Sequence, residues 1–169
     1  GISNAAVFGW IAGESAASYI KTVDIQDINT VAGEANHRTD FIKQISSRKN
    51  GASWQEVNIA LSQIMQDYAG MVRTDSLLQA GLNHIRKLRN KAEAILFAVN
   101  QHEMVHCLEV LNLLELSELV FTGMLERKET RGNYRRLDYP FVNPVLDGKV
   151  IIYKKVDGQP HIEWREAKN

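Results

Sequence analysis

The sequence predicts an all-α fold, namely a three-helix antiparallel bundle similar to a spectrin repeat. Apolar residues recur at helical spacing from residue 54 to about residue 130. Residues that cap helices stand ahead of these stretches, and the three prolines all lie in the tail. We therefore expect a shorter apolar helix, then the bundle, then an extended C-terminal tail with a β-hairpin.

The first segment, residues 4–22, alternates small and large apolar residues. Gly9 and Gly13 are four residues apart, so on a helix they share one face and would let another backbone approach closely. Simple packing accounts for the same pattern.

The first bundle helix follows a mostly polar stretch that ends at Arg48. Ser53 and Glu56 have the spacing of a capping box, in which each side chain accepts a hydrogen bond from the other residue's backbone. An apolar stripe follows over residues 54–71, and Gly70 is a suitable end for this helix.

The next helix is predicted to begin at Thr74 or Asp75, and helical character then continues to about Thr130. A break near Asn100 would divide this stretch into two helices. Residues 107–121 are apolar around more than half of the helix circumference, so we expect them to be buried between neighbours. Gly132 is predicted to stop the helix.

The tail contains two strand-like stretches, "KVIIYKKV" and "HIEWRE", on either side of "DGQP". The turn residues between them predict a small β-hairpin.

The composition narrows the functional classes. Lys plus Arg and Asp plus Glu both total 20, so the net charge does not favour a nucleic-acid partner. The single cysteine, Cys107, excludes an internal disulfide, and no run of about 18 apolar residues predicts a membrane span. The apolar opening segment has no basic stretch before it, so it does not resemble a signal peptide, and with the single cysteine this favours a cytoplasmic chain. A mature chain would be unusual in opening on such a segment, so we expect a chain cut from a longer one.

The stretch "VNQHEMVHCLEVL" contains His102, Glu103 and His106 at the spacing of zinc peptidases. A zinc peptidase needs a third ligand, and no one of the four downstream glutamates stands out (Glu115, Glu118, Glu126 and Glu129). The helix also runs on into its most apolar part. We therefore favour the interpretation of these residues as histidines on a helix surface over the zinc hypothesis.

Three blocks resemble the C-terminal region of the succinate dehydrogenase/fumarate reductase flavoprotein family. "LELSELVFTGMLERKETRGNYRRLDYP" resembles its leucine-rich helix and the charged motif after it. The matching positions are Arg127, Glu129, Thr130, Arg131, Gly132, Arg135 or Arg136, Asp138, Tyr139 and Pro140, with Tyr134 where the family usually has histidine. "MQDYAGMVRTDSLLQAGL" and "AAVFGWIAGESAA" resemble two further family segments, with Trp10 in place of an arginine.

The resemblance implies an FAD-dependent oxidoreductase that transfers a hydride between FAD and a small dicarboxylate or related acceptor. The chain has no Gly-x-Gly-x-x-Gly, so we expect that the fragment holds no cofactor, metal or catalytic residue and is inactive alone. The expected division is 1–23 as the last helix of the FAD-binding domain, 24–133 as the bundle domain and 134–169 as the tail.

The resemblance also implies contacts. The backbone at Gly1, Ile2 and Ser3 would meet the flavin in the full-length protein. The expected partners are the chain's own N-terminal FAD-binding domain, an iron–sulfur or other electron-transfer subunit through which it would associate with a membrane, and a second copy through residues 4–20. Arg127, Glu129, Arg131 and Asp138 would either form an ion-pair network at the helix end or dock a partner. A free-standing helical interaction module is the alternative.

Overall fold

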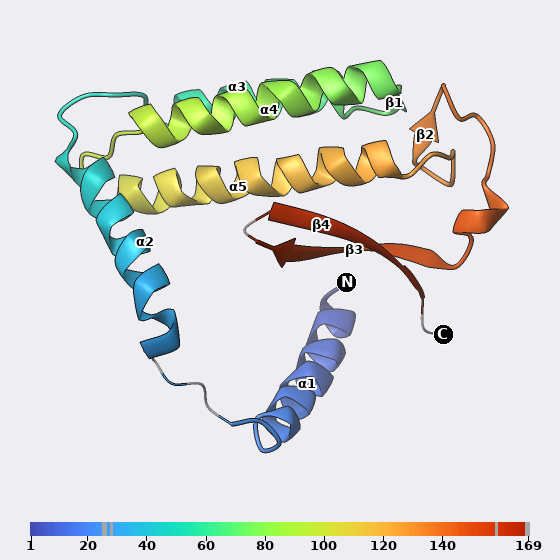
Figure 1. Cartoon of the computed structure of the whole chain (residues 1–169), viewed down its shortest axis with the longest axis horizontal. Helices are drawn as coiled ribbons and strands as arrows, with labels where there is room; N and C mark the ends of the chain where they lie inside the picture. The colour runs from blue at the N-terminus through green and yellow to red at the C-terminus, as the bar shows by residue number, and fades with distance from the viewer. Residues whose placement is uncertain (25–26, 28, 158, 168–169) are drawn as a thin grey trace. The chain divides into compact units, whose positions relative to one another are not determined.

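The structure is a computed structural model that describes residues 1–24, 27, 29–157 and 159–167. The chain divides into two compact units, Gly1–Phe41 and Ile42–Asn169. The predicted helical architecture with a C-terminal hairpin is confirmed (Figure 1).

The first unit contains α1 (Ile2–Tyr19) and the first part of α2 (Asn29–Ser47). None of the residues of α1 is buried. A Cβ atom built on Gly9 or Gly13 would meet no atom within 4 Å, so neither glycine serves a close backbone approach within the described chain.

The second unit is built on α3 (Trp54–Tyr68), α4 (Asp75–Ile95) and α5 (Gln101–Glu126). Short connections at opposite ends of the bundle join α3 to α4 and α4 to α5, so neighbouring helices run antiparallel (Figure 1). The core consists of apolar side chains from all three helices and from the end of α2, and includes Ile45, Val57, Leu61, Leu78, Leu82, Ile85, Val110, Leu114 and Phe121.

Local hydrogen bonds explain where the bundle helices begin. Glu56 N–H donates to Ser53 Oγ at 3.3 Å and Ser53 N–H donates to Glu56 Oε2 at 2.7 Å, which is the predicted capping box. Thr74 caps α4 through Leu77 N–H, and Asn100 caps α5 in the same way.

The three bundle helices come close together at Gly81 on α4. A Cβ atom there would lie 2.4 Å from Phe121 Cε1 and 2.6 Å from Tyr68 Cβ. Glycine is therefore the residue that lets α3, α4 and α5 approach one another at this level.

The end of α5 departs from the prediction. The structure ends α5 at Glu126, although the sequence predicted helix to about Thr130. The turn at Gly132 (φ +56°) comes six residues later, after a segment whose polar groups bond to the tail instead of continuing the helix.

Across the described residues, no helix has the length and apolar character needed to cross a membrane.

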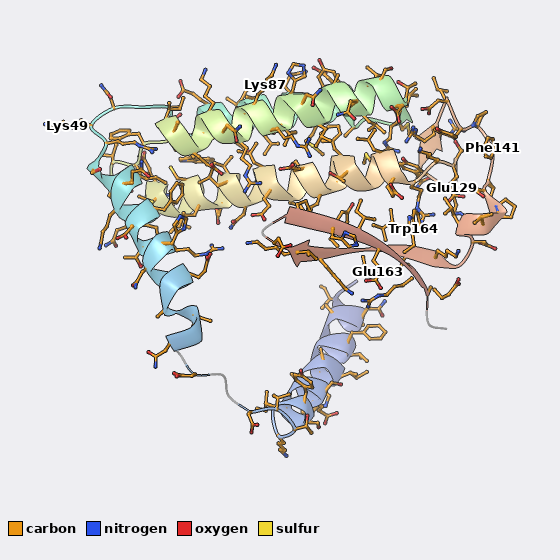
Figure 2. All side chains as sticks on the ribbon, viewed as in Figure 1. Lys49, Lys87, Glu129, Phe141, Glu163 and Trp164 are labelled. Atoms are coloured by element: carbon orange, nitrogen blue, oxygen red, sulfur yellow. The ribbon has the colours of Figure 1, made fainter. Side chains whose placement is uncertain are left out.

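Two small sheets complete the second unit. β3 (Lys149–Val156) pairs antiparallel with β4 (Gln159–Glu166), as predicted, although Gly158 in the predicted turn lies outside the described residues. Tyr153 O–H donates to Leu119 C=O at 2.6 Å, which fixes the hairpin on α5. β1 (Val72–Arg73) pairs in parallel with β2 (Arg135–Arg136), and a 3₁₀ turn, η1 (Pro144–Leu146), follows β2. Figure 2 shows Glu129 just beyond the C-terminal end of α5, near this turn.

Candidate functional site

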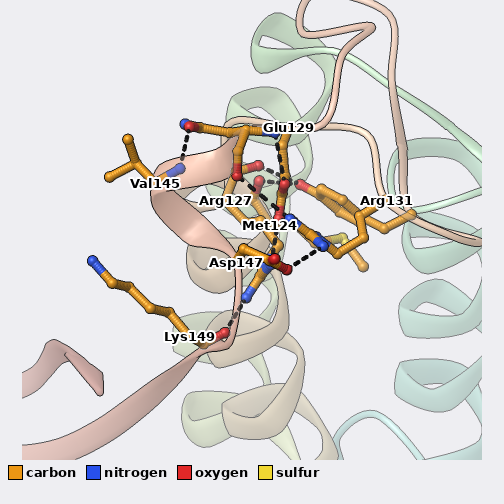
Figure 3. A network of polar contacts seen from close by, with 9 residues as sticks. Met124, Arg127, Glu129, Arg131, Val145, Asp147 and Lys149 are labelled. Carbon is orange, nitrogen blue, oxygen red and sulfur yellow. Dashed lines mark hydrogen bonds and ion pairs between the residues drawn. The ribbon is translucent and has the colours of Figure 1, made fainter. Parts of the chain in front are cut away.

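A network of charged side chains lies where α5 ends and the tail begins. It contains all four residues that the sequence singled out, Arg127, Glu129, Arg131 and Asp138, and adds Arg136 from β2. Figure 3 shows its first half, which is centred on one carboxylate.

Glu129 is fully buried, and three groups donate to it. Arg127 Nη1 and Arg131 Nε (3.0 Å) both donate to its Oε1, while Asn143 N–H donates to Oε2 at 3.0 Å. Two guanidinium groups and one backbone amide therefore compensate the cost of burying this carboxylate.

The two arginines extend the network into the tail. Arg127 Nη2 donates to Lys149 C=O at 2.8 Å, at the start of β3, and its guanidinium lies 5.1 Å from the centroid of the Trp164 ring. Arg131 Nη1 donates to Asp147 Oδ1 at 2.8 Å, beside η1 (Figure 3). Glu129 thus connects the end of α5 to the turn and to the hairpin.

The second half of the network is centred on Arg136, which is 1% exposed. Its Nε and Nη2 donate to the two oxygens of Asp138 at 2.8 and 2.7 Å, and its Nη1 donates to Met124 C=O on α5 at 2.7 Å. Asp138 Oδ2 also accepts a hydrogen bond of 2.8 Å from Asp75 N–H in the first turn of α4. This arginine–aspartate pair therefore joins α4, α5 and the tail.

The sequence match left Arg135 and Arg136 as alternatives for one family position. The structure buries Arg136 and exposes Arg135 because successive residues of β2 point to opposite sides. The pairing of β2 with β1 decides which side of β2 faces the bundle. The local sequence pattern does not predict this pairing.

The strand pairing also brings in Arg73 and Tyr134, for which the sequence predicts no role in the network. The Arg73 guanidinium lies 5.0 Å from the centroid of the Tyr134 ring, and Arg73 Nη2 donates to Ala69 C=O at 3.4 Å. Arg73 Nε and Nη1 are buried without a hydrogen-bond partner in the structure. Tyr134 O–H donates to Met124 C=O on α5.

The electrostatics favour the ionised form of each carboxyl group. Hydrogen bonds from Arg136 lower the pKa of Asp138 to about 2. Burial alone would raise the pKa of Glu129, but the hydrogen bonds from Arg131, Asn143 and Arg127 outweigh it, so the pKa of Glu129 is lowered. The pKa of Arg136 is raised, chiefly by its hydrogen bonds with Asp138.

This chemistry suits a structural joint. The buried carboxylate of Glu129 is ion-paired, and no group of three or more potential metal ligands occurs among the residues that the structure describes. Cys107 is buried, and burial raises the pKa of its thiol, which disfavours the reactive thiolate.

The remaining predicted residues lie elsewhere. Gly1 is the N-cap of α1, and Ile2 and Ser3 occupy its first turn, where no side chain caps the free N–H groups. His102, Glu103 and His106 lie at the start of α5, where Glu103 Oε2 accepts a hydrogen bond of 2.9 Å from Val99 N–H. Glu103 therefore helps to cap the helix.

The chain is similar in sequence to fumarate reductase flavoprotein subunits and to L-aspartate oxidases. The Haemophilus influenzae fumarate reductase flavoprotein subunit is 26% identical over 171 residues, which cover 96% of this chain and 28% of that protein. The L-aspartate oxidase of Acinetobacter baylyi is 30% identical over 152 residues, which cover 88% of this chain and 26% of that protein. The chain thus spans little more than a quarter of the length of these relatives.

A solved structure shows the same fold. A variant of Escherichia coli quinol fumarate reductase FrdA superposes with a TM-score of 0.79 at 22% identity, over 96% of this chain and 29% of that one. The sequence model of the family described as "Fumarate reductase flavoprotein C-term" matches residues 58–168. The resemblance read from the sequence is thereby confirmed, and the chain belongs to the family of fumarate reductase flavoprotein C-terminal regions.

Proposed function

We propose that this chain is the C-terminal helical region of a longer FAD-dependent oxidoreductase, and that it supports the flavin-binding part without being catalytic itself. The family match over residues 58–168 carries this proposal. It is supported by the chain's share of its relatives, about a quarter of their length, and by the lack of a Gly-x-Gly-x-x-Gly motif in its 169 residues.

We propose that residues 1–23 belong to the FAD-binding domain, 24–133 to the bundle domain and 134–169 to the tail. The first assignment is supported by the exposure of large apolar side chains along α1, including Phe8 (65%) and Trp10 (71%). A helix with so much exposed apolar surface requires a covering partner. We assign that partner to the flavin-binding part in the full-length protein and to a second copy, through residues 4–20, when the chain is alone.

The start of α1 suits a contact with one edge of a flavin. Gly1 has no side chain, and the first N–H groups of the helix, at Ile2 and Ser3, have no side-chain acceptor. Free N–H groups and the positive end of the helix dipole stabilise negative charge placed there. FAD itself supplies the hydride chemistry. Only this edge contact is assigned to the chain.

For the charged network we propose a structural role with a second, docking role. As a joint it fixes α5 to the tail through Glu129 and Arg136. Around it the tail exposes large apolar side chains, namely Leu137, Phe141, Val142 and Val145. Such a patch beside fixed charges is suited to a protein partner, either the flavin-binding part or an electron-transfer subunit that would bring the protein to a membrane.

The substrate class follows from the relatives, which are named as fumarate reductases and L-aspartate oxidases. We propose a small dicarboxylate as the partner of hydride transfer in the full-length protein.

The test compares this chain with the full-length product of its gene. The full-length protein is expected to co-purify with FAD, seen by its visible absorbance, and to catalyse electron transfer between a redox dye and fumarate, succinate or aspartate. Residues 1–169 alone are expected to bind no FAD and to show no turnover. A native start codon immediately before Gly1 would contradict the proposal and favour a free-standing interaction module.

A further inference from the structure

The first two turns of α5 carry a pair of histidines that the proposed function does not use. The Nε2 atoms of His102 and His106 lie 3.3 Å apart and share a hydrogen bond, which a metal ion would replace. A zinc ion bound tetrahedrally at ~2.0–2.1 Å from each of two imidazole nitrogens places those nitrogens about 3.3 Å apart. The spacing of the pair therefore matches a shared metal ion.

The His106 ring is fixed from two sides. Trp54 at the start of α3 stacks on it, with ring centroids 4.4 Å apart and planes 27° apart. Glu109 Oε2 lies 2.7 Å from His106 Nδ1. In the tautomer that donates from Nδ1 to this carboxylate, the His106 lone pair is on Nε2, on the side of His102.

The pair is also accessible. His102 is exposed, and the His106 side chain is 28% exposed. Both imidazole rings are therefore at least partly open to solvent.

We propose that His102 and His106 form a two-ligand site for a divalent transition metal that prefers imidazole, the class of Zn²⁺, Ni²⁺ and Cu²⁺. Glu109 is a positioning residue that orients His106 through Nδ1. Water fills the other coordination positions.

The site is distinct from that of a zinc peptidase. Among the described residues, no third His, Cys, Asp or Glu completes a ligand group. Glu103, the would-be general base, is hydrogen-bonded to the Val99 backbone. The positive end of the α5 dipole opposes a cation, whereas the carboxylate of Glu109 favours it. Because only two side chains ligate the ion, we expect weaker binding than at a three-ligand site.

The first measurement is calorimetric titration of the chain with ZnCl₂ and NiCl₂. The expected result is one saturable site per chain, at least tenfold weaker in His102→Ala and in His106→Ala. His37→Ala is the matched control, because His37 lies on a helix without a histidine four residues away, and it is expected to bind as the unaltered chain does.

Two further variants separate orientation from ligation. Glu109→Gln keeps the shape of the side chain but removes its charge, and is expected to weaken binding about tenfold. Trp54 lies against the site, so Ni²⁺ should quench its fluorescence, and Trp54→Phe should lose the quenching while retaining calorimetric binding.

An NMR spectrum of the unaltered chain tests the site without a substitution that could disturb folding. On addition of Zn²⁺, imidazole ¹⁵N resonances are expected to shift for His102 and His106 and to stay in place for the other three histidines. The proposal is overturned if neither metal binds saturably, if binding persists equally in both His→Ala variants, or if other histidines shift instead.

Discussion

Two apolar helices of this chain have opposite surroundings. α1 (Ile2–Tyr19) buries none of its residues, whereas α5 (Gln101–Glu126) buries six, from Met104 to Phe121. Neither has a narrow apolar stripe, since apolar residues occur around most of the circumference of both. α3 and α4 pack against α5 and the hairpin is hydrogen-bonded to it through Tyr153, whereas the unit that contains α1 buries no residue of that helix.

An apolar helix therefore requires a covering surface, but its composition does not indicate whether that surface lies in the same chain. For α5 the partners lie in the same chain. For α1 the exposed side chains agree with the proposal that the covering surface belongs to the remaining three quarters of a longer protein.

The largest effect is expected in the C-terminal part of α5, at Phe121. Phe121→Ala would leave a cavity between α4 and α5 beside Gly81, and should lower the free energy of unfolding by about 3–5 kcal/mol. Urea denaturation of the chain measures this loss. A loss below about 1 kcal/mol would mean that α5 is no more embedded than α1.

The next effect concerns the end of α5, which is held by a buried charge network that α1 lacks. Glu129→Ala would leave Arg127 and Arg131 without their shared acceptor, and is expected to cost about 3 kcal/mol of unfolding free energy.

Glu163→Ala is the matched control for this network. Glu163 also contacts two cations, Lys154 and Arg165, but on the surface of the hairpin. Surface ion pairs are weak, so its loss should be clearly smaller than that of Glu129. Equal losses would show that burial does not set the strength of the α5 joint.

Acid should loosen the same joint. Asp138 has a pKa of about 2 in the folded chain, below its ordinary value of 3.8. Its contribution, roughly 2 kcal/mol, is full above its ordinary pKa and is lost as the pH falls through the folded pKa. Urea denaturation between pH 6 and about pH 2 should show this loss, and Asp138→Asn should remove that part of the pH dependence.

The smallest effect is expected in α1. Phe8→Ala should change the stability of the chain by less than about 0.5 kcal/mol, because Phe8 is 65% exposed. The same change in the full-length protein should cost about 3 kcal/mol or more if the flavin-binding part covers α1. Equal, small effects in both proteins would mean that α1 is uncovered in both and would contradict the proposed assignment.

Analytical ultracentrifugation of the chain alone tests whether two copies associate. Phe8→Ala should weaken any dimer formed through residues 4–20.

Much of the fold could be predicted from local pattern. The Ser53–Glu56 capping box, a helix start at Thr74 or Asp75 and the two hairpin strands all follow from short-range spacing, and the structure shows the capping box, a cap at Thr74 and both strands. The end of α5 could not be predicted in the same way. Lys128, Glu129 and Thr130 are compatible with a helix, but Glu129 leaves it to meet two arginines and the Asn143 backbone, and Thr130 N–H donates to Phe141 C=O.

The residues of the candidate site were likewise only partly predictable from the sequence. Arg127, Glu129, Arg131 and Asp138 could be selected by their resemblance to a family motif, and the structure brings all four to one end of the bundle. Arg73 and Asp75 could not be connected with that motif from sequence, because the contact of Asp75 with Asp138 spans 63 residues.

Local sequence was enough to predict where the bundle helices begin and that the tail forms a hairpin, because these features depend on hydrogen bonds and side-chain spacing within a few residues. It also determined that His102 and His106 would share a helix face, since four residues make about one turn. The tertiary structure alone decided that β1 pairs with β2, that Arg136 and not Arg135 is buried, and that Glu129 is enclosed by cations. These features depend on how distant segments meet, and local backbone preferences do not encode that meeting.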